Sequence, residues 1–312
     1  MNAAPTGLRL LDAAATRAAL PFARLIPALR DLFAEGCEVP PRHVHQLPGV
    51  TSLLMPAWQP GGFYGVKVVN VAPGNAARGL PGLHASYLLH DAATGAPLAL
   101  IDGDVITARR TAAASALAAD FLARPDARHL LVVGAGRVAA LLPEAYRAVR
   151  PIGRVSVWAR RPEAAAELAA QWRGLGFDAA PAADLAAAVR AADIVSCATL
   201  ATAPVVHGAW LAPGSHLDLI GSFTPAMREA DDDAFRDATI AVDTEESLQK
   251  SGELLEPMAH GVFAPADVRA TLAALCRGEA SGRRSAEERT VFKSVGTALE
   301  DLAAAMLAYG PR

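Results

Sequence analysis

The sequence predicts an α/β protein with two domains, one built on a doubly wound parallel sheet and the other on a mixed, mostly antiparallel sheet. Three observations support this prediction. Between about residues 128 and 245, short apolar runs alternate with helical patterns, as is typical of a parallel sheet covered by helices. A glycine-rich turn joins the first of these runs to the first helical pattern. Before residue 110, β-like runs are separated by Gly- and Pro-rich turns, which favours antiparallel strands.

Length and composition are consistent with a globular enzyme. The chain has 312 residues, of which 52% are hydrophobic, and can bury a large core in each of two domains. The net charge is −3 and no long basic run occurs, so nothing indicates a nucleic acid or an acidic membrane as a partner. We identify no signal peptide and no segment of membrane-spanning length.

The three cysteines, Cys37, Cys197 and Cys276, are widely spaced and form no C-x-x-C motif. This pattern is typical of free thiols in a reducing compartment, so we expect a cytoplasmic protein. Cys197 lies in the apolar run 194–199. We therefore expect it in the core rather than as a nucleophile.

In the N-terminal zone, a helix is expected over residues 21–35, followed by short strands that include 65–69 and 87–89. An alanine-rich helix over residues 107–123 then connects to the central zone, with Thr107 as its N-cap.

The central zone contains five expected strands and three expected helices. The strands are 130–133, 154–158, 193–198, 216–220 and 239–242, and the helices are 138–149, 162–172 and 185–192. Pro143 falls inside the first helix, where an interior proline costs about 3 kcal/mol, so we expect a bend. We interpret the acidic run 229–233 as a solvated helix entry, and residues 289–309 as one long closing helix.

The turn after the first central strand has the sequence Gly134-Ala-Gly136-Arg137-Val138-Ala139. Gly134 permits a tight turn, Gly136 lets the backbone approach a pyrophosphate, and Ala139 lets the next helix lie close to the sheet. The helix N-terminus then offers free N–H groups to the anion. An ordinary glycine turn is the alternative, but the flanking strand and helix fall where a dinucleotide site requires them. The sequence therefore predicts a Rossmann domain, with Gly134, Gly136, Arg137, Val138 and Ala139 as cofactor contacts.

The residues after the second central strand bear on the choice of cofactor. NAD-binding sites of this kind usually place an Asp or Glu there to bind the ribose 2′-hydroxyl. Here Arg160 and Arg161 follow the strand, and the first acid is Glu163. Two guanidinium groups match a 2′-phosphate, so we expect NADPH to be preferred, with NADH also usable. The alternative is that both arginines begin a solvent-facing helix.

Several strings occur in an order and at spacings that resemble the ornithine cyclodeaminase/µ-crystallin family over nearly the whole chain. The most specific is Thr107-x-x-Arg110-Thr111-Ala-Ala, which precedes the glycine turn. The others are Pro41-Arg42, Met55-Pro56, Gly65-Val-Lys67, Pro73-Gly-Asn75, Gly221-x-x-x-Pro225-x-x-x-Glu229 and Val291-Phe-Lys-Ser-Val-Gly296.

The resemblance implies a homodimer with two domains in each subunit. Residues 1–115 and 297–312 would form a substrate-binding and dimerisation domain, and residues 116–296 a dinucleotide-binding Rossmann domain. It also implies a catalytic cleft where the two domains meet.

In this resemblance, Arg42, Lys67 and Arg110 match positions that hold the substrate carboxylate. The residue types suit that role, because arginine binds a carboxylate through a bidentate fork and lysine adds a point charge. A surface ion pair is the alternative for each. It is weakest for Lys67, whose apolar neighbours indicate a buried strand, and strongest for Arg42, which lies in a proline-rich loop. We interpret Arg109 as a charge on the helix face.

The resemblance also places Thr111 toward the cofactor phosphates and residues 294–296, including Val295, near the nicotinamide. Thr199 and Asp243 end strands at the edge where a doubly wound sheet binds its ligand, so we count both as cofactor contacts. An aspartate at that place can equally form a turn. His43 and His45 have no third ligand at a supportive spacing, so we expect no metal site.

Two departures from the cyclodeaminases distinguish among the activities that the resemblance allows. Those enzymes carry an aspartate at the place of Phe223, for deamination, and an acid at the place of Leu53, near the distal amine of ornithine. Neither side chain present here can accept a proton, so ornithine cyclodeaminase is disfavoured.

The resemblance is closest to the ketimine reductases. It implies an oxidoreductase that uses NAD(P)H to reduce Δ1-pyrroline-2-carboxylate or Δ1-piperideine-2-carboxylate to proline or pipecolate, with the ring near Phe223, Leu53 and Met55. Two alternatives remain open: an open-chain amino acid dehydrogenase such as alanine dehydrogenase, and a nicotinamide-dependent binding protein of the µ-crystallin type.

Overall fold

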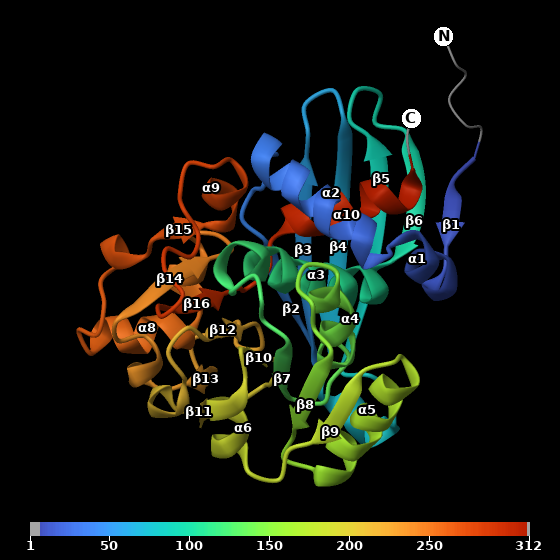
Figure 1. Cartoon of the computed structure of the whole chain (residues 1–312). Helices are drawn as coiled ribbons and strands as arrows, with labels where there is room; N and C mark the ends of the chain where they lie inside the picture. Colours follow the sequence, from blue (N-terminus) through green and yellow to red (C-terminus); the bar gives the residue numbers. More distant parts are fainter. Residues whose placement is uncertain (1–6, 311–312) are drawn as a thin grey trace. The chain divides into compact units, whose positions relative to one another are not determined.

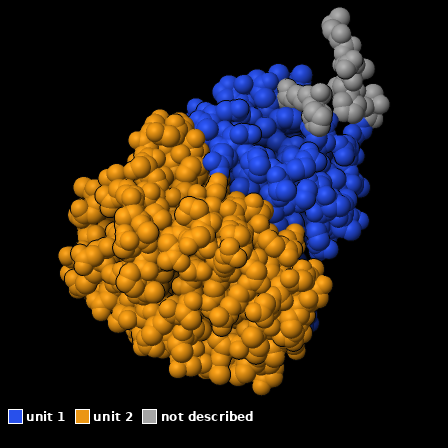
Figure 2. Space-filling model, in the orientation of Figure 1, with its two compact units in different colours: residues 1–110, 297–312 blue, residues 111–296 orange. Residues whose placement is uncertain are grey.

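The computed structural model of the chain describes residues 7–310 (Figure 1). The chain divides into two compact units, which Figure 2 shows in different colours. Unit 1 comprises residues 1–110 and 297–312, and unit 2 comprises residues 111–296. The division falls inside one helix, between Arg110 and Thr111. Each unit is built around its own sheet.

Unit 1 contains a mixed, mostly antiparallel sheet, as predicted. Its six strands lie in the order β1-β6-β5-β4-β3-β2, and only β1 and β6 pair in parallel. The strands are β1 (Arg9–Leu11), β2 (His43–Leu47), β3 (Val50–Trp58), β4 (Phe63–Val71), β5 (Leu83–Asp91) and β6 (Pro97–Asp102). In β4, buried and half-buried residues alternate from Phe63 to Val69, so one face of this strand points into the core.

Two long helices pack together in unit 1, and one of them covers the sheet. Helix α2 (Phe22–Glu35) buries an apolar stripe that includes Leu25, Leu29 and Phe33. Helix α10 (Ala298–Tyr309) packs against α2 and against β3 and β4 (Figure 1). It is buried along most of its length, including its first-turn acids. The shorter helix α1 (Ala13–Ala19) begins at Asp12, whose carboxylate accepts from the backbone N–H of Ala15.

Helix α3 (Gly103–Leu122) begins four residues earlier than the sequence predicts. The Asp102 carboxylate accepts from the backbone N–H of Val105 at 2.8 Å, so Asp102 and not Thr107 satisfies the first turn. Residue 103 must be glycine, because a Cβ there would lie 2.7 Å from backbone atoms of Ala85 and Ser86. Across residues 7–310, we find no helix both long and apolar enough to traverse a lipid bilayer.

Unit 2 contains the predicted parallel sheet, with eight strands in the order β15-β14-β16-β12-β10-β7-β8-β9. The five predicted strands correspond to β7 (His129–Val133), β8 (Arg154–Trp158), β10 (Ile194–Cys197), β12 (His216–Leu219) and β14 (Ala238–Val242). Three strands extend this sheet beyond the prediction: β9 (Asp178–Pro181), β15 (Ala270–Thr271) and β16 (Arg289–Lys293). A separate parallel pair consists of β11 (Thr202–Val206) and β13 (Arg228–Ala230).

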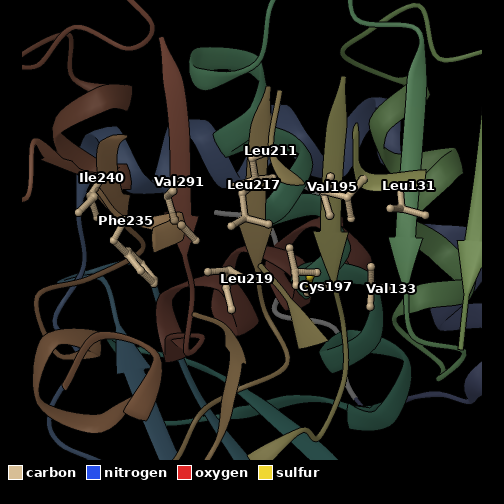
Figure 3. Close-up of a cluster of buried hydrophobic side chains, with 14 of the residues drawn as sticks. Leu131, Val133, Val195, Cys197, Leu211, Leu217, Leu219, Phe235, Ile240 and Val291 are labelled. Carbon is tan, nitrogen blue, oxygen red and sulfur yellow. The ribbon is translucent and has the colours of Figure 1, made fainter. Parts of the chain in front are cut away.

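Apart from α5, the helices that follow the strands of unit 2 are short. They are α4 (Leu142–Arg147), α5 (Pro162–Gly174), α6 (Leu185–Ala191), α7 (Ser247–Lys250), α8 (Gly252–Ala259) and α9 (Leu272–Cys276). On one face of the sheet, alternate residues of neighbouring strands form an apolar core, which Figure 3 shows from Leu131 across to Ile240. Cys197 lies fully buried within this core, as predicted.

Two further predicted helices differ from those in the structure. Residues 289–309 form β16 and α10 with a turn between them, because the apolar and β-branched run Thr290-Val-Phe292 pairs in parallel with β12 and β14. The helix predicted over 138–149 consists of a 3-10 turn (Ala139–Leu141) followed by α4. Pro143 lies in the first turn of α4, where no backbone donor is needed, so it does not interrupt that helix.

Candidate active site

Strands β7 and β10 are neighbours at the centre of the parallel sheet of unit 2. From β7 the chain continues to β8 and β9 on one side, whereas β10 leads to β12 and β16 on the other. The carboxyl ends of β7 and β10 therefore meet at the topological switch point, where doubly wound sheets bind ligands. The residues just beyond these ends are Gly134 and Thr199.

The turn after β7 has the backbone features that a dinucleotide needs. Gly134 has φ +125°, and a Cβ there would lie 2.5 Å from the carbonyl oxygen of Ala198, so only glycine fits. Gly136 is exposed, and no atom lies within 4 Å of where its Cβ would be, which leaves room for a ligand against the backbone. Ala139 is fully buried, while Arg137 is exposed and Val138 half-buried. These residues fit a dinucleotide pyrophosphate.

Arg160 and Arg161 are both exposed and lie between the end of β8 and the start of α5. Arg161 is the N-cap residue of α5, and Glu163 is in the first turn of that helix. No carboxylate side chain intervenes between β8 and Glu163. The segment thus offers cations where NAD-specific sites usually offer an acid.

Thr199 is held by a carboxylate that the sequence interpretation assigned to solvent. Glu229 Oε1 accepts from the backbone N–H and the hydroxyl of Thr199, each at 2.7 Å. Glu229 lies on β13 and is fully buried, so the prediction of a solvated helix entry over residues 229–233 is wrong at this residue. Burial raises the pKa of Glu229 to about 7, although hydrogen bonds from Thr199 and the charge of Lys293 oppose the rise.

Asp243, directly after β14, binds the segment that follows β16. Its Oδ2 accepts from the Ser294 hydroxyl at 3.0 Å and from the backbone N–H groups of Val295 and Gly296 at 2.8 and 2.7 Å. Gly296 has φ +78°, which completes the turn. Burial raises the pKa of Asp243, and these hydrogen bonds limit the rise. The structure therefore brings together Asp243 and residues 294–296, which are far apart in the sequence.

In unit 1, Lys67 and Arg110 meet on the first turn of α10. The Lys67 ammonium lies 2.7 Å from Asp301 Oδ2, and Arg110 Nε donates to Asp301 Oδ1 at 3.0 Å. Arg110 also pairs with Glu300, with 2.5 Å between Nη1 and Oε2. Lys67 is 1% exposed and Arg110 is 6% exposed, while both carboxylates are fully buried. We call these four residues the charge cluster of unit 1.

The electrostatics of the charge cluster bring the pKa of Lys67 close to physiological pH. Burial lowers the pKa of Lys67 to about 8, the Arg110 charge also lowers it, and Asp301 offsets part of the change. Two cations that share one rigidly placed acceptor are fixed in position. Such a pair can orient an anionic substrate.

Glu300 and Asp301 are functional residues that were not predicted from the sequence. Their signal is an adjacent pair of acids in the otherwise apolar and alanine-rich segment 298–309. Acids on a buried helix face need cationic partners, so this pair indicates buried cations in the same unit but does not identify them. The interpretation of residues 289–309 as one long helix concealed that placement.

The other predicted residues of unit 1 lie in different surroundings. Arg42 is half-buried just before β2, and Leu53 and Met55 lie on β3, where Met55 pairs in register with Lys67. Arg109 is not a surface charge as predicted: it is buried, its Nε donates to the Leu20 carbonyl at 2.7 Å, and its guanidinium lies 4.2 Å from the centre of the Phe22 ring.

Further residues that the sequence analysis singled out are partly or fully accessible. Thr111, the first residue of unit 2, is half-buried on α3. Phe223 is 48% exposed, in the loop after β12. His43 and His45 are both exposed on β2.

Comparison with known proteins identifies the family. The sequence model of the ornithine cyclodeaminase/mu-crystallin family matches residues 31–311. The chain belongs to this family.

Several of the similar proteins are named reductases or dehydrogenases. The Δ1-pyrroline-2-carboxylate reductase of Paracoccus denitrificans is 49% identical over 257 residues, which cover 82% of this chain and 81% of that protein. The Δ1-pyrroline-2-carboxylate reductase of Thermococcus litoralis, solved with NADH and L-proline, superposes with a TM-score of 0.92 at 34% identity and covers 97% of this chain and 96% of its own. An archaeal alanine dehydrogenase dimer with bound NAD gives a TM-score of 0.91 at 31% identity, with 97% and 95% covered. This family member is likewise an oxidoreductase.

Proposed function

We propose that this protein reduces a cyclic imine carboxylate, Δ1-pyrroline-2-carboxylate or Δ1-piperideine-2-carboxylate, to proline or pipecolate with a reduced nicotinamide cofactor. The observation that carries the proposal is the charge cluster of unit 1, in which Lys67 and Arg110 are buried and fixed by Asp301. The likeness to a reductase that binds NADH and L-proline supports it.

The reaction adds a hydride to the imine carbon and a proton to the imine nitrogen, which converts C=N to CH–NH. A bound reduced nicotinamide supplies the hydride. Arg110 and Lys67 hold the substrate carboxylate, and fixed orientation of reactants can contribute roughly 7–11 kcal/mol to lowering a barrier. The Lys67 ammonium is our candidate donor of the proton. Arg42 is assigned to the same carboxylate on the family resemblance.

The residues of unit 2 would hold the cofactor. In this proposal Gly134, Gly136, Arg137, Val138 and Ala139 bind the pyrophosphate, and Thr111 lies toward the phosphates. Thr199, Asp243 and Val295 contribute the remaining contacts. Asp243 acts through the turn at residues 294–296, because its carboxylate already accepts three hydrogen bonds from that turn.

We further propose that NADPH is preferred over NADH. Arg160 and Arg161 are exposed and adjacent, and guanidinium groups bind a phosphate more strongly than a hydroxyl. Replacing both by Ala should raise the KM for NADPH by about tenfold or more, as expected for a lost charge-assisted bond, and leave that for NADH nearly unchanged. Equal use of the two cofactors by the unmodified enzyme would contradict this preference.

The side chains at positions 53, 55 and 223 favour an imine reductase over ornithine cyclodeaminase. Leu53, Met55 and Phe223 offer neither a proton acceptor nor a partner for a distal amine. The likeness to an alanine dehydrogenase keeps an open-chain amino acid dehydrogenase as the second candidate. A nicotinamide-dependent binding protein without turnover is the third.

One absorbance assay separates these functions. The purified protein is mixed with NADPH or NADH and offered each cyclic imine, or pyruvate with ammonia, while the nicotinamide absorbance is followed. Consumption with a cyclic imine supports the reductase, and consumption only with pyruvate and ammonia supports the dehydrogenase. Tight cofactor binding without any turnover supports the binding protein. Conversion of ornithine to proline with NAD+ at a comparable rate would contradict the reductase.

We also propose that the protein forms a homodimer through the sheet of unit 1. Five apolar residues lie side by side in one row across strands β1, β6, β5, β4 and β3. In that order they are Leu10, Leu100, Leu88, Val66 and Pro56. All five side chains are half-buried or exposed, and Leu10 and Leu100 are 74% and 39% exposed. A continuous apolar row of this kind is typical of an interface. We propose a second copy of the chain as the partner that covers this row, and the likeness to a dimeric alanine dehydrogenase supports this choice.

A further inference from the structure

Unit 2 contains a second buried set of charges, distinct from the charge cluster of unit 1. Glu229, Glu253 and Lys293 are each fully buried. Glu229 Oε1 binds Thr199 after β10, and its Oε2 accepts from the backbone N–H of Gly221, after β12, at 2.7 Å. One carboxylate therefore holds the ends of two neighbouring strands. The proposed function assigns the first segment to the cofactor.

The two strand ends are in backbone contact at this point. A Cβ on Gly221 would lie 2.0 Å from the carbonyl oxygen of Thr199 and 2.4 Å from Glu229 Oε1. No side chain larger than hydrogen fits at residue 221. A displacement of either strand end is therefore transmitted to the other.

The next residue of the loop is anchored by the other two charges. The Ser222 hydroxyl donates to Glu253 Oε2 at 2.8 Å and accepts from the Lys293 ammonium at 2.7 Å. Lys293 also donates to the carbonyl oxygens of Leu219 and Ser222, at 2.9 and 2.5 Å. The same Glu253 accepts from the backbone N–H groups of Glu229 and Ala230 at 2.8 and 2.9 Å. All three charges thus lie on one hydrogen-bonded network.

Phe223 follows this anchor directly and is 48% exposed, whereas Ser222 is fully buried. The loop is thus fixed up to residue 222 and presents the Phe223 side chain. Burying two carboxyl groups and an ammonium group costs several kcal/mol for each group that is ionised, before pairing, and apolar packing would stabilise the fold at least as well. A network with so high a free-energy cost is better explained by accurate positioning of the loop than by a contribution to stability.

We propose that Glu229 is a positioning residue that couples the cofactor-binding end of β10 to the loop that presents Phe223 to the imine substrate. This inference rests on the proposed function. Glu229 touches neither ligand. It sets the spacing between the segments that do, and Glu253 and Lys293 fix the loop relative to Glu229.

The test is Glu229→Gln in the full chain. Glutamine has one acceptor oxygen, so its amide NH2 must face either Thr199 or Gly221, both of which donate there. Two constants are measured: the Kd for NADPH, by nicotinamide fluorescence without imine, and the imine KM at saturating cofactor. We expect both to rise by about tenfold, the effect of losing one charge-assisted hydrogen bond. The matched control is Glu256→Gln on α8, whose carboxylate pairs with Arg228 and is 48% exposed. Both constants should stay within twofold of wild type in the control.

The outcomes separate the positioning role from a general loss of stability and from the proposed function. A rise in only one constant for Glu229→Gln, or in neither, overturns the coupling. If circular dichroism shows that Glu229→Gln does not fold, Thr199→Val is used instead. This variant removes one of the three donors to Glu229. The imine KM should then rise about threefold, as for a weaker neutral bond, and an unchanged KM overturns the coupling. If the proposed function itself is wrong, the wild type turns over no cyclic imine, whereas failure of the coupling leaves the wild type active.

Discussion

Lys67 and Arg110 contribute two buried positive charges, and Glu300 and Asp301 balance them within the same unit. An unpaired buried cation would cost several kcal/mol, so the acids of α10 make it feasible to keep both cations away from solvent. A substrate carboxylate at this cluster would meet donors already fixed in place. This is pre-organisation at the level of single side chains.

Replacing Lys67 or Arg110 by Ala should abolish most of the imine reduction while cofactor binding stays nearly intact. A lost charge-assisted bond corresponds to about 1.5–3 kcal/mol, or at least a tenfold fall in kcat/KM. Steady-state kinetics and a fluorescence titration of NADPH measure the two effects. Lys250→Ala is the control, because Lys250 pairs with Glu246 in unit 2 and is partly exposed. Variants that keep rates within a few-fold of wild type would rule out the carboxylate role.

The pKa of Lys67 predicts how activity depends on pH. Because burial lowers this pKa to about 8, the ammonium is present below pH 8 and is lost as the pH rises through that value. The imine KM should therefore rise above about pH 8. In Lys67→Arg the cation persists, so the rise should move to higher pH. If wild type and variant share one pH profile, another group, such as the imine nitrogen, controls it.

Helices and strands could be predicted from the sequence where the residue pattern of a segment reflects how that segment is buried. Four of the five predicted strands of unit 2 are buried on both faces, β8 being the exception, and the bounds of all five agree to within one residue. Strand β16 was not predicted, because Arg289 and Lys293 flank only a short apolar run, and such a run also fits a helical period. Glu229 and Arg109 were misplaced for a related reason: a charged residue is assigned to solvent unless its partner is known.

The charge cluster shows the same limit at the candidate site. The family resemblance selected Lys67 and Arg110, but nothing in the local sequence connects Lys67 with Asp301, which follows it by more than two hundred residues. Contacts of that separation are created by the topology of unit 1. The nature of the cations could be predicted, and their partners could not.

Two glycines in the turn after β7 should respond differently to alanine. Gly134→Ala forces a Cβ against the Ala198 carbonyl at φ +125°, so it should lower the free energy of unfolding by about 1–3 kcal/mol and weaken cofactor binding. Gly136→Ala places its methyl in open space, so it should weaken cofactor binding with little change in stability. Thermal unfolding and an NADPH titration of both variants measure this. Equal losses of Tm would contradict the assignment of Gly136 to the ligand.

For the whole molecule, the apolar row on the sheet of unit 1 predicts the assembly state. Leu100→Lys places a charge within this row and should convert the dimer to a monomer, because a desolvated charge opposes association. Light scattering after size exclusion measures the mass, with 32.3 kDa for one chain. Leu175→Lys is the control, since Leu175 is 51% exposed in unit 2. A monomeric wild type would rule out the proposed dimer.

The position of α10 in the chain has a consequence for how the protein is made. Unit 2 is one continuous segment, whereas unit 1 needs residues from both ends of the sequence. During synthesis, Lys67 and Arg110 leave the ribosome long before Glu300 and Asp301 exist to neutralise them. The core of unit 1 therefore cannot close until residues 298–309 have emerged, while unit 2 can already condense around its own sheet. Helix α10 would then complete a unit whose strands β1 to β6 were all synthesised before any strand of unit 2.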